Sequence, residues 1–152
     1  MPLCAQISRL GGSSGGENDI VIISAGATVN ANNIVSFVAT SATQNNSTDA
    51  GNAVLTAKSG AGRTISVANA TGSSKAFTLV GSDGNDSLTG GAGDDIISVT
   101  SAGHANADIL DGGAGTDTLV LSSGTHTLTS ENKIVNIENI NAKNIEKKSR
   151  IE

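Results

Sequence analysis

Seven aspartates lie between residues 81 and 120, in a stretch that contains no lysine or arginine. They are half of the 14 acidic residues in a chain of 152 residues with a net charge of −5. Like charges held close together repel one another unless a counter-charge is present. The stretch therefore predicts that something outside the chain neutralises these carboxylates.

Four of these aspartates occupy the sixth place of a nine-residue unit, Gly-Gly-x-Gly-x-Asp-x-aliphatic-x. The units at 90–98 and 112–120 match the pattern in full, and the unit at 81–89 lacks only its second glycine. The unit at 103–111 keeps its first glycine, the aspartate and the aliphatic residue, and has His104 and Asn106 where glycines would stand. Turn chemistry alone does not require such an in-register repeat, which makes an ordinary β-protein with Asp-Gly turns a poor explanation.

The residue types in each unit favour one kind of metal. Glycine adopts the positive φ angles with which a short turn reverses and directs its carbonyl groups inward, and the sixth residue adds a carboxylate. Carbonyl and carboxylate oxygens form a shell that suits Ca²⁺ and excludes soft metals. The next three residues predict a short strand whose aliphatic member points into a narrow core; these members are Leu88, Ile97, Leu110 and Leu119.

The elements that position these turns are predicted to be short strands. Apolar alternation occurs in runs of about four to six residues rich in β-branched side chains, with almost no helical periodicity. The runs lie at 18–24, 33–39, 53–58, 63–68, 76–81, 95–100 and 117–123. Segment 41–53 is predicted to be a loop, and the likeness of 18–30 to 116–128 suggests that one structural unit occurs near both ends. With aromatics at 1%, thin layers of Ile, Val and Leu must form the core, together with Phe37 and Phe77.

The nonapeptides resemble those of the repeats-in-toxin (RTX) family, and most of all those of its surface-layer and extracellular structural members. The resemblance implies an all-β fold, a right-handed parallel β-roll or β-solenoid with calcium-binding glycine-aspartate turns. Turns alternate sides in such a roll, so one coil takes two nonapeptides and each ion lies between stacked turns. Asp86 would then pair with Asp108, and Asp95 with Asp117, in both cases 22 residues apart because "VTSA" (99–102) is inserted.

The Ca²⁺ ligands that the resemblance implies are the four repeat aspartates and nearby residues of the turns. They are Asp86, Asp95, Asp108, Asp117, Gly81, Asp83, Asn85, Gly90, Ala92, Asp94, Gly112, Ala114 and Thr116. The site of the degenerate third unit is expected to be the weaker one.

We expect one domain with four parts. Residues 1–80 form a β-rich, solenoid-like N-terminal part, 81–120 the calcium-binding roll, 121–142 a capping strand ladder and 143–152 a basic tail. The tail is interpreted as solvated rather than nucleic-acid-binding, because no aromatic residue is interleaved with its basic residues. The sequence contains no tract of 18 apolar residues, so insertion into a membrane is not predicted.

Catalytic patterns are missing from the sequence. It contains no His-Glu-x-x-His, Cys-x-x-Cys or Gly-x-Ser-x-Gly, and Cys4 has no neighbouring His or Asn to activate it. The glutamates Glu131, Glu138 and Glu146 show no pairing and are interpreted as solvated. We therefore expect no enzymatic activity.

Three functions remain for such a chain. The first is a calcium-dependent extracellular structural protein that self-assembles head to tail into a surface layer or filament, with cell-surface polysaccharide as a further expected partner. The second is the C-terminal secretion and folding module of a type I-secreted enzyme, toxin or adhesin. The third is an ice- or glycan-binding solenoid, which a regular rank of threonines would support. A secreted or bacterial cell-surface location is expected, because only extracellular Ca²⁺, at about 10⁻³ M, fills sites of modest affinity.

Overall fold

A computed structural model describes residues 5–8, 20–47, 53–99, 107–122, 126 and 133–143. All regular elements in these ranges are β-strands. Among the described residues there is thus no helix long and apolar enough to cross a membrane. The all-β prediction is confirmed.

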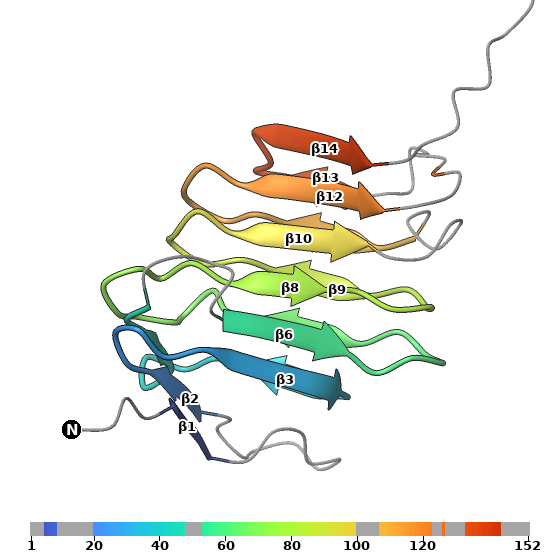
Figure 1. Cartoon of the computed structure of the whole chain (residues 1–152). Coiled ribbons are helices and arrows are strands. Elements are labelled where there is room, and N and C mark those ends of the chain that lie inside the picture. Colours follow the sequence, from blue (N-terminus) through green and yellow to red (C-terminus); the bar gives the residue numbers. More distant parts are fainter. Residues whose placement is uncertain are drawn as a thin grey trace, which may run out of the picture.

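Most strands belong to two parallel sheets that the chain enters alternately (Figure 1). The front sheet consists of β3 (Val29–Ile34), β6 (Ala53–Ala57), β8 (Thr78–Val80), β10 (Ile96–Val99), β12 (Thr118–Ser122) and β14 (Asn139–Lys143). The back sheet consists of β4 (Ser36–Val38), β7 (Thr64–Ser66), β9 (Ser87–Thr89), β11 (Ile109–Asp111) and β13 (Lys133–Val135). Each coil of the chain adds one strand to each sheet, so the predicted parallel β-roll is confirmed.

This alternation sorts the turns onto two sides of the roll. Front-to-back turns follow front strands, as 58–63 and 81–86 do, and back-to-front turns follow back strands, as 90–95, 112–117 and 136–138 do. Successive turns on one side therefore stack on one another, at the spacing of about 4.8 Å that separates paired strands.

A third, smaller sheet lies at the N-terminal end of the roll. It joins β1 (Ala5–Ser8) to β2 (Ile20–Ile23) in antiparallel fashion, and β2 to β5 (Gln44–Asn45) in parallel. The prediction of a loop over 41–53 is wrong where β5 lies, because Asn45 is buried and its side chain contacts Ala76 and Ser47 through hydrogen bonds. The two segments that resemble each other in sequence, 18–30 and 116–128, each contain a strand, but β2 belongs to this sheet and β12 to the front sheet, and 18–19, 123–125 and 127–128 lie outside the described residues.

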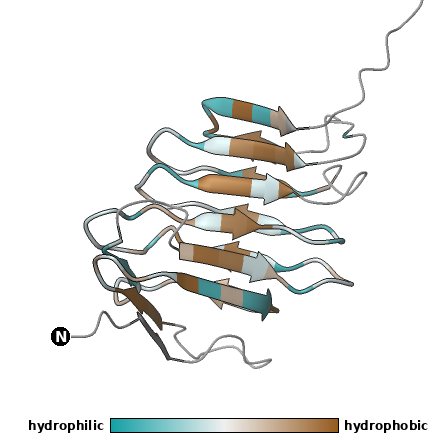
Figure 2. Ribbon diagram, in the orientation of Figure 1, coloured by the Kyte–Doolittle hydropathy of each residue, from teal (hydrophilic) through white to brown (hydrophobic). Residues whose placement is uncertain are grey.

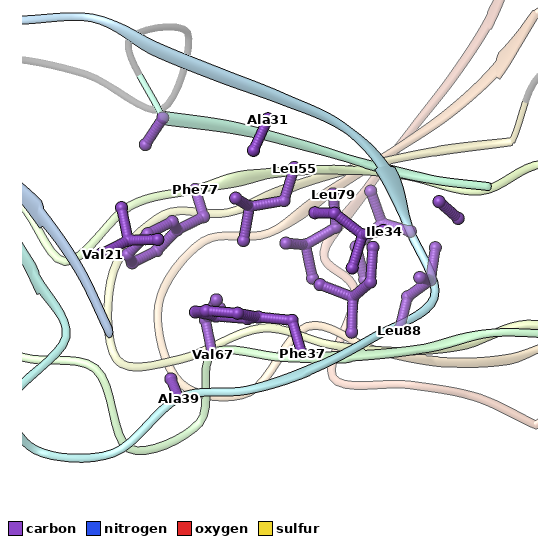
Figure 3. Close-up of a cluster of buried hydrophobic side chains, with 14 of the residues drawn as sticks. Val21, Ala31, Ile34, Phe37, Ala39, Leu55, Val67, Phe77, Leu79 and Leu88 are labelled. Carbon is purple, nitrogen blue, oxygen red and sulfur yellow. The ribbon is translucent and has the colours of Figure 1, made fainter. Parts of the chain in front are cut away.

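The core runs along the roll between the front and back sheets. Figure 2 shows hydrophobic residues along the middle of the strands, and Figure 3 shows Phe37, Leu55, Leu79 and Leu88 among the side chains gathered between the sheets. Phe37 and Phe77 are fully buried, as expected from the sequence. The aliphatic member of each nonapeptide, from Leu88 to Leu119, is also 0% exposed, which confirms the predicted inward direction.

Candidate metal centre

The four repeat aspartates lie at the end of a turn, immediately before a strand, and their side chains point inward. The exposed fractions of Asp86, Asp95, Asp108 and Asp117 are 2%, 1%, 2% and 0%. A carboxylate loses most of its hydration at such a place, and the cost must be offset by hydrogen bonds, a cation or a proton.

Asp95 and Asp117 lie on neighbouring coils on the back-to-front side. Ile96 pairs with Thr118 in the front sheet, and the amide of Asp95 donates to Asp117 Oδ1 at 2.7 Å. The Oδ1 of Asp95 accepts from the Phe77 amide of the preceding coil at 2.6 Å, and its Oδ2 accepts from the Gly91 amide at 2.6 Å. Each carboxylate thus caps a backbone amide of the coil before it.

Asp86 and Asp108 form the equivalent pair on the front-to-back side. The Asp86 amide donates to Asp108 Oδ1 at 2.8 Å, and Asp86 itself accepts from the amides of Arg63 and Ser82, both at 2.7 Å. The structure therefore brings together the two pairs of aspartates that the sequence suggested.

Oxygen atoms converge at the first glycine of the second and fourth nonapeptides. A Cβ on Gly90 would lie 2.5 Å from Asp95 Oδ2 and 2.0 Å from the carbonyl oxygen of Gly112 on the next coil. A Cβ on Gly112 would lie 2.6 Å from Asp117 Oδ2 and 1.9 Å from the carbonyl oxygen of Asn136. Only glycine fits here, and the donors that gather around it are the carboxylate and carbonyl oxygens that Ca²⁺ prefers.

The other predicted ligands are divided between the two sides of the roll. Turns 90–95 and 112–117, which contain Gly90, Ala92, Asp94, Gly112, Ala114 and Thr116, stack on each other, and Asp94 Oδ1 accepts from the Thr116 amide at 2.8 Å. Turn 81–86, which contains Gly81, Asp83 and Asn85, lies on the opposite side, where Asp83 accepts from the Gly60 amide at 2.9 Å. No three acidic, histidine or cysteine side chains cluster as a ready-made metal site among the described residues. Backbone carbonyls would therefore have to supply much of the coordination.

Burial changes the acidity of the stacked carboxyl groups. Desolvation raises the pKa of Asp95 to about 7, although the amides of Gly91 and Phe77 lower it, and the charges of Asp117 and Asp94 raise it further. Desolvation also raises the pKa of Asp117. The hydrogen bond from the Asp95 amide lowers this pKa, and the negative charge of Glu138 raises it further. These groups are thus costly to ionise without a cation.

Two residues that lie in register with the repeat aspartates were not identified from the sequence. Arg63 takes the place of the aspartate in the coil before Asp86, and its side chain donates to the carbonyls of Lys58 at 3.0 Å and Ser59 at 3.4 Å. Glu138 takes that place in the coil after Asp117 and accepts from the Asp117 amide at 2.7 Å. The interpretation of Glu138 as solvated is incomplete, because the side chain is exposed but also bonded to the roll. An aliphatic residue two places later, Ile65 or Ile140, was the signal in both cases.

Comparison with known families agrees with this geometry. The family model for the RTX calcium-binding nonapeptide repeat, in four copies, matches residues 78–101 and 100–125. No curated protein and no solved structure matches the chain. RTX repeats form calcium-binding β-rolls, are structural rather than catalytic, and occur typically in secreted proteins.

Proposed function

Because residues 78–125 are RTX calcium-binding repeats, we propose that this is a calcium-dependent extracellular structural protein. Ca²⁺ folds the acidic part of the roll, and the completed roll joins further copies through its ends into a filament or surface layer. The observation that carries the proposal is the stack of buried carboxylates on consecutive coils with no basic residue in the same segment.

The ion is needed because the stack places like charges close together away from water. Asp95 and Asp117 are 1% and 0% exposed, and the amide of one is bonded to the carboxylate of the other. Repulsion between buried charges at strand spacing is strong, and hydrogen bonds from single amides offset only part of it. Binding of Ca²⁺ to these oxygens reverses the sign of the local electrostatics and so couples metal affinity to folding.

The ends of the roll support the assembly part of the proposal. Within the described residues β13 and β14 are the last strands of their sheets, and they carry the exposed apolar residues Val135 (48%) and Ile140 (60%). At the other end β3 and β4 are the edge strands of the front and back sheets, with Val35 and Val38 exposed at 42% and 51%. All strands of the two sheets are parallel, so a second copy stacked on either end would continue the same pairing, and a head-to-tail contact of this kind propagates.

An extracellular location follows from the ion. Sites built from turn carbonyls and single carboxylates have modest affinity, and about 10⁻³ M Ca²⁺ outside cells fills them whereas cytosolic Ca²⁺ does not. We therefore propose that the protein is folded after secretion.

The outward face of the front sheet gives no support to ice or glycan binding. The column of paired residues that runs through it is Asn30, Val54, Thr78, Ile96, Thr118 and Asn139. Threonine is interrupted by apolar residues in this column, whereas a regular rank would be needed.

The test is a Ca²⁺ titration of the purified protein followed by circular dichroism and light scattering. We expect β-structure and particle size to rise together, and both to collapse when a chelator is added. A full β-signal at millimolar Ca²⁺ with monomeric size would contradict self-assembly and favour the secretion and folding module of a larger protein. A full β-signal in chelator would contradict calcium-driven folding.

A further inference from the structure

The turn at 112–117 differs from the described turns at 81–86 and 90–95 in the hydrogen bonds of its aspartate. In the first two nonapeptides the second Asp oxygen accepts an amide from its own turn, Ser82 for Asp86 and Gly91 for Asp95. The corresponding amide of the fourth unit, that of Gly113, donates instead to Asp111 Oδ1 at 3.1 Å. Asp117 Oδ2 is therefore left buried with no hydrogen-bond partner among the described residues.

The cause lies at the ninth place of the preceding unit. This place is Thr89, Ser98 or Val120 in the other nonapeptides but Asp111 in the third. The carboxylate of Asp111 draws the Gly113 amide to itself and also accepts from the side-chain amide of Asn136 at 2.8 Å. A buried carboxylate oxygen without a donor is costly, which points to a ligand that the chain itself does not supply.

The coil after this turn brings further oxygen atoms to the same place. Glu138 lies in register with Asp117 and is bonded to its amide through Oε2 at 2.7 Å. The carbonyl oxygen of Asn136 and the free Oδ2 of Asp117 both point toward Gly112, where a Cβ would meet them at 1.9 and 2.6 Å. The turn 136–138 is short, and Asn136 adopts a φ of 54° to make it. The Asp117 carboxylate and the Asn136 carbonyl thus border one glycine, and the Glu138 carboxylate is bonded to the backbone amide of the same aspartate.

We propose that Asp117 and Glu138, with the carbonyl group of Asn136, form a further Ca²⁺ site that closes the back-to-front column. It lies one coil beyond the site shared by Asp95 and Asp117, and one of its carboxylates comes from outside the nonapeptide repeats. An all-oxygen set with two carboxylates selects a hard divalent cation, and the irregular short turn suits Ca²⁺ better than the strict octahedron of Mg²⁺.

The site has a structural purpose in the assembly, because it fixes the last described coil onto the repeats. This inference rests on the proposed calcium binding of the repeats, and the experiment has to separate the two. Glu138→Gln serves this purpose, since Gln keeps an oxygen that accepts the Asp117 amide but removes the negative charge. Asp95→Asn reports on the repeat site, and Glu17→Gln makes the same change of charge far away in the sequence.

The experiment is calorimetric titration of Ca²⁺ into the chelator-treated full-length protein and the three variants. We expect Glu138→Gln to weaken one bound ion by about tenfold or more and to leave the others unchanged, whereas Glu17→Gln matches the wild type. Asp95→Asn should weaken a different ion, so that the double variant shows both losses. If Asp95→Asn loses an ion but Glu138→Gln matches the wild type, Glu138 only caps an amide and the additional site is refuted. A wild-type protein that binds no Ca²⁺ would refute the proposed function itself.

Discussion

The coils before and after Phe77 fill the same inward position with opposite chemistry. On the back-to-front side the residues in register are Val29, Ala53 and Phe77, followed by Asp95, Asp117 and Glu138. Val29, Ala53 and Phe77 are 3%, 0% and 0% exposed, and Asp95 and Asp117 are buried as deeply. We refer to residues 29–80 as the apolar coils and to residues 81–122 as the acidic coils.

The two regions also differ in the length of chain that each coil uses. Val54 pairs with Thr78, 24 residues later, whereas Thr78 pairs with Ile96 after only 18. The longer coils bury both Phe37 and Phe77, and burial of aromatic side chains stabilises them directly. The shorter coils bury one or two aliphatic side chains for each strand and no aromatic one, so their stability depends more on what neutralises the carboxylates. One solenoid geometry can therefore be stabilised by its own core or by bound ions.

Removal of Ca²⁺ is expected to have the largest effect and to separate the two regions. Amide hydrogen exchange in excess chelator should show loss of protection in β9 to β12, while β3, β6 and β7 keep more of theirs, because only the acidic coils bury unneutralised charge. Mass spectrometry of peptide fragments with and without Ca²⁺ measures this. Equal loss of protection in both regions would show that the roll unfolds as one cooperative unit. The apolar and acidic coils would then differ in sequence but not in stability.

Leu55→Ala and Asp95→Ala make one truncation in each region. Leu55→Ala should lower the free energy of unfolding by about 2–5 kcal/mol, equally with Ca²⁺ and with chelator, because it leaves a cavity in the apolar coils. Asp95→Ala should abolish binding of one ion and reduce the stabilisation that Ca²⁺ provides, since it removes a ligand and leaves the Phe77 amide uncapped. Urea unfolding at several Ca²⁺ concentrations provides both numbers. A Leu55→Ala effect that depends on Ca²⁺ would contradict the independence of the apolar coils.

Gly112→Ala and Gly60→Ala compare a crowded turn with an open one. The new Cβ at residue 112 would overlap the Asn136 carbonyl and Asp117 Oδ2, and we expect a loss of about 3 kcal/mol together with weaker Ca²⁺ binding. At residue 60 nothing lies within 4 Å, so the cost is only the strain of a φ of 101°, about 1–2 kcal/mol. Thermal unfolding and calorimetry of the two variants test the order, and similar losses would show that crowding at Gly112 relaxes easily.

The last effect expected, which concerns a single group, is that of pH on the ion-free protein. The pKa of Asp95 is raised from 3.8 to about 7 in the folded state, so folding takes up a proton between these values. The contribution of Asp95 to the free energy of unfolding in chelator should therefore be greatest below pH 4. It should fall by up to about 1.4 kcal/mol per pH unit as the pH rises toward 7. Urea midpoints at pH 5 and pH 8 measure this, with Asp95→Asn as the control that removes the group. In Ca²⁺ the trend should reverse, because protons compete with the ion.

The acidic coils were predicted from sequence more fully than the apolar ones. Their glycines and aspartates recur in register, because turns that stack on one another have the same requirements at each repeat, and the strand positions and both aspartate pairs follow. The insertion at 99–102 did not disturb the pairing of Asp95 with Asp117, since β10 and β12 still align.

The apolar coils have no such repeat, because many different apolar side chains can fill a core equally well. The role of Asn45 was hidden for this reason: its side chain bonds to Ala76, 31 residues away, and nothing local in "TQNNS" indicates burial. Arg63 and Glu138 were missed because neither is an aspartate, although each lies in register with a repeat aspartate. That register can be recognised only when the strand pairing is known.

The capping of amides by carboxylates has a direction. Asp95 completes the coil of Phe77, Asp117 that of Asp95, and Glu138 that of Asp117, so every coil depends on its C-terminal neighbour. Loss of one coil therefore uncaps the coil before it, and unfolding is expected to proceed from the C-terminal end of the roll. Under mechanical load applied there, we expect the coils to detach one at a time and the last described coil to protect all the others.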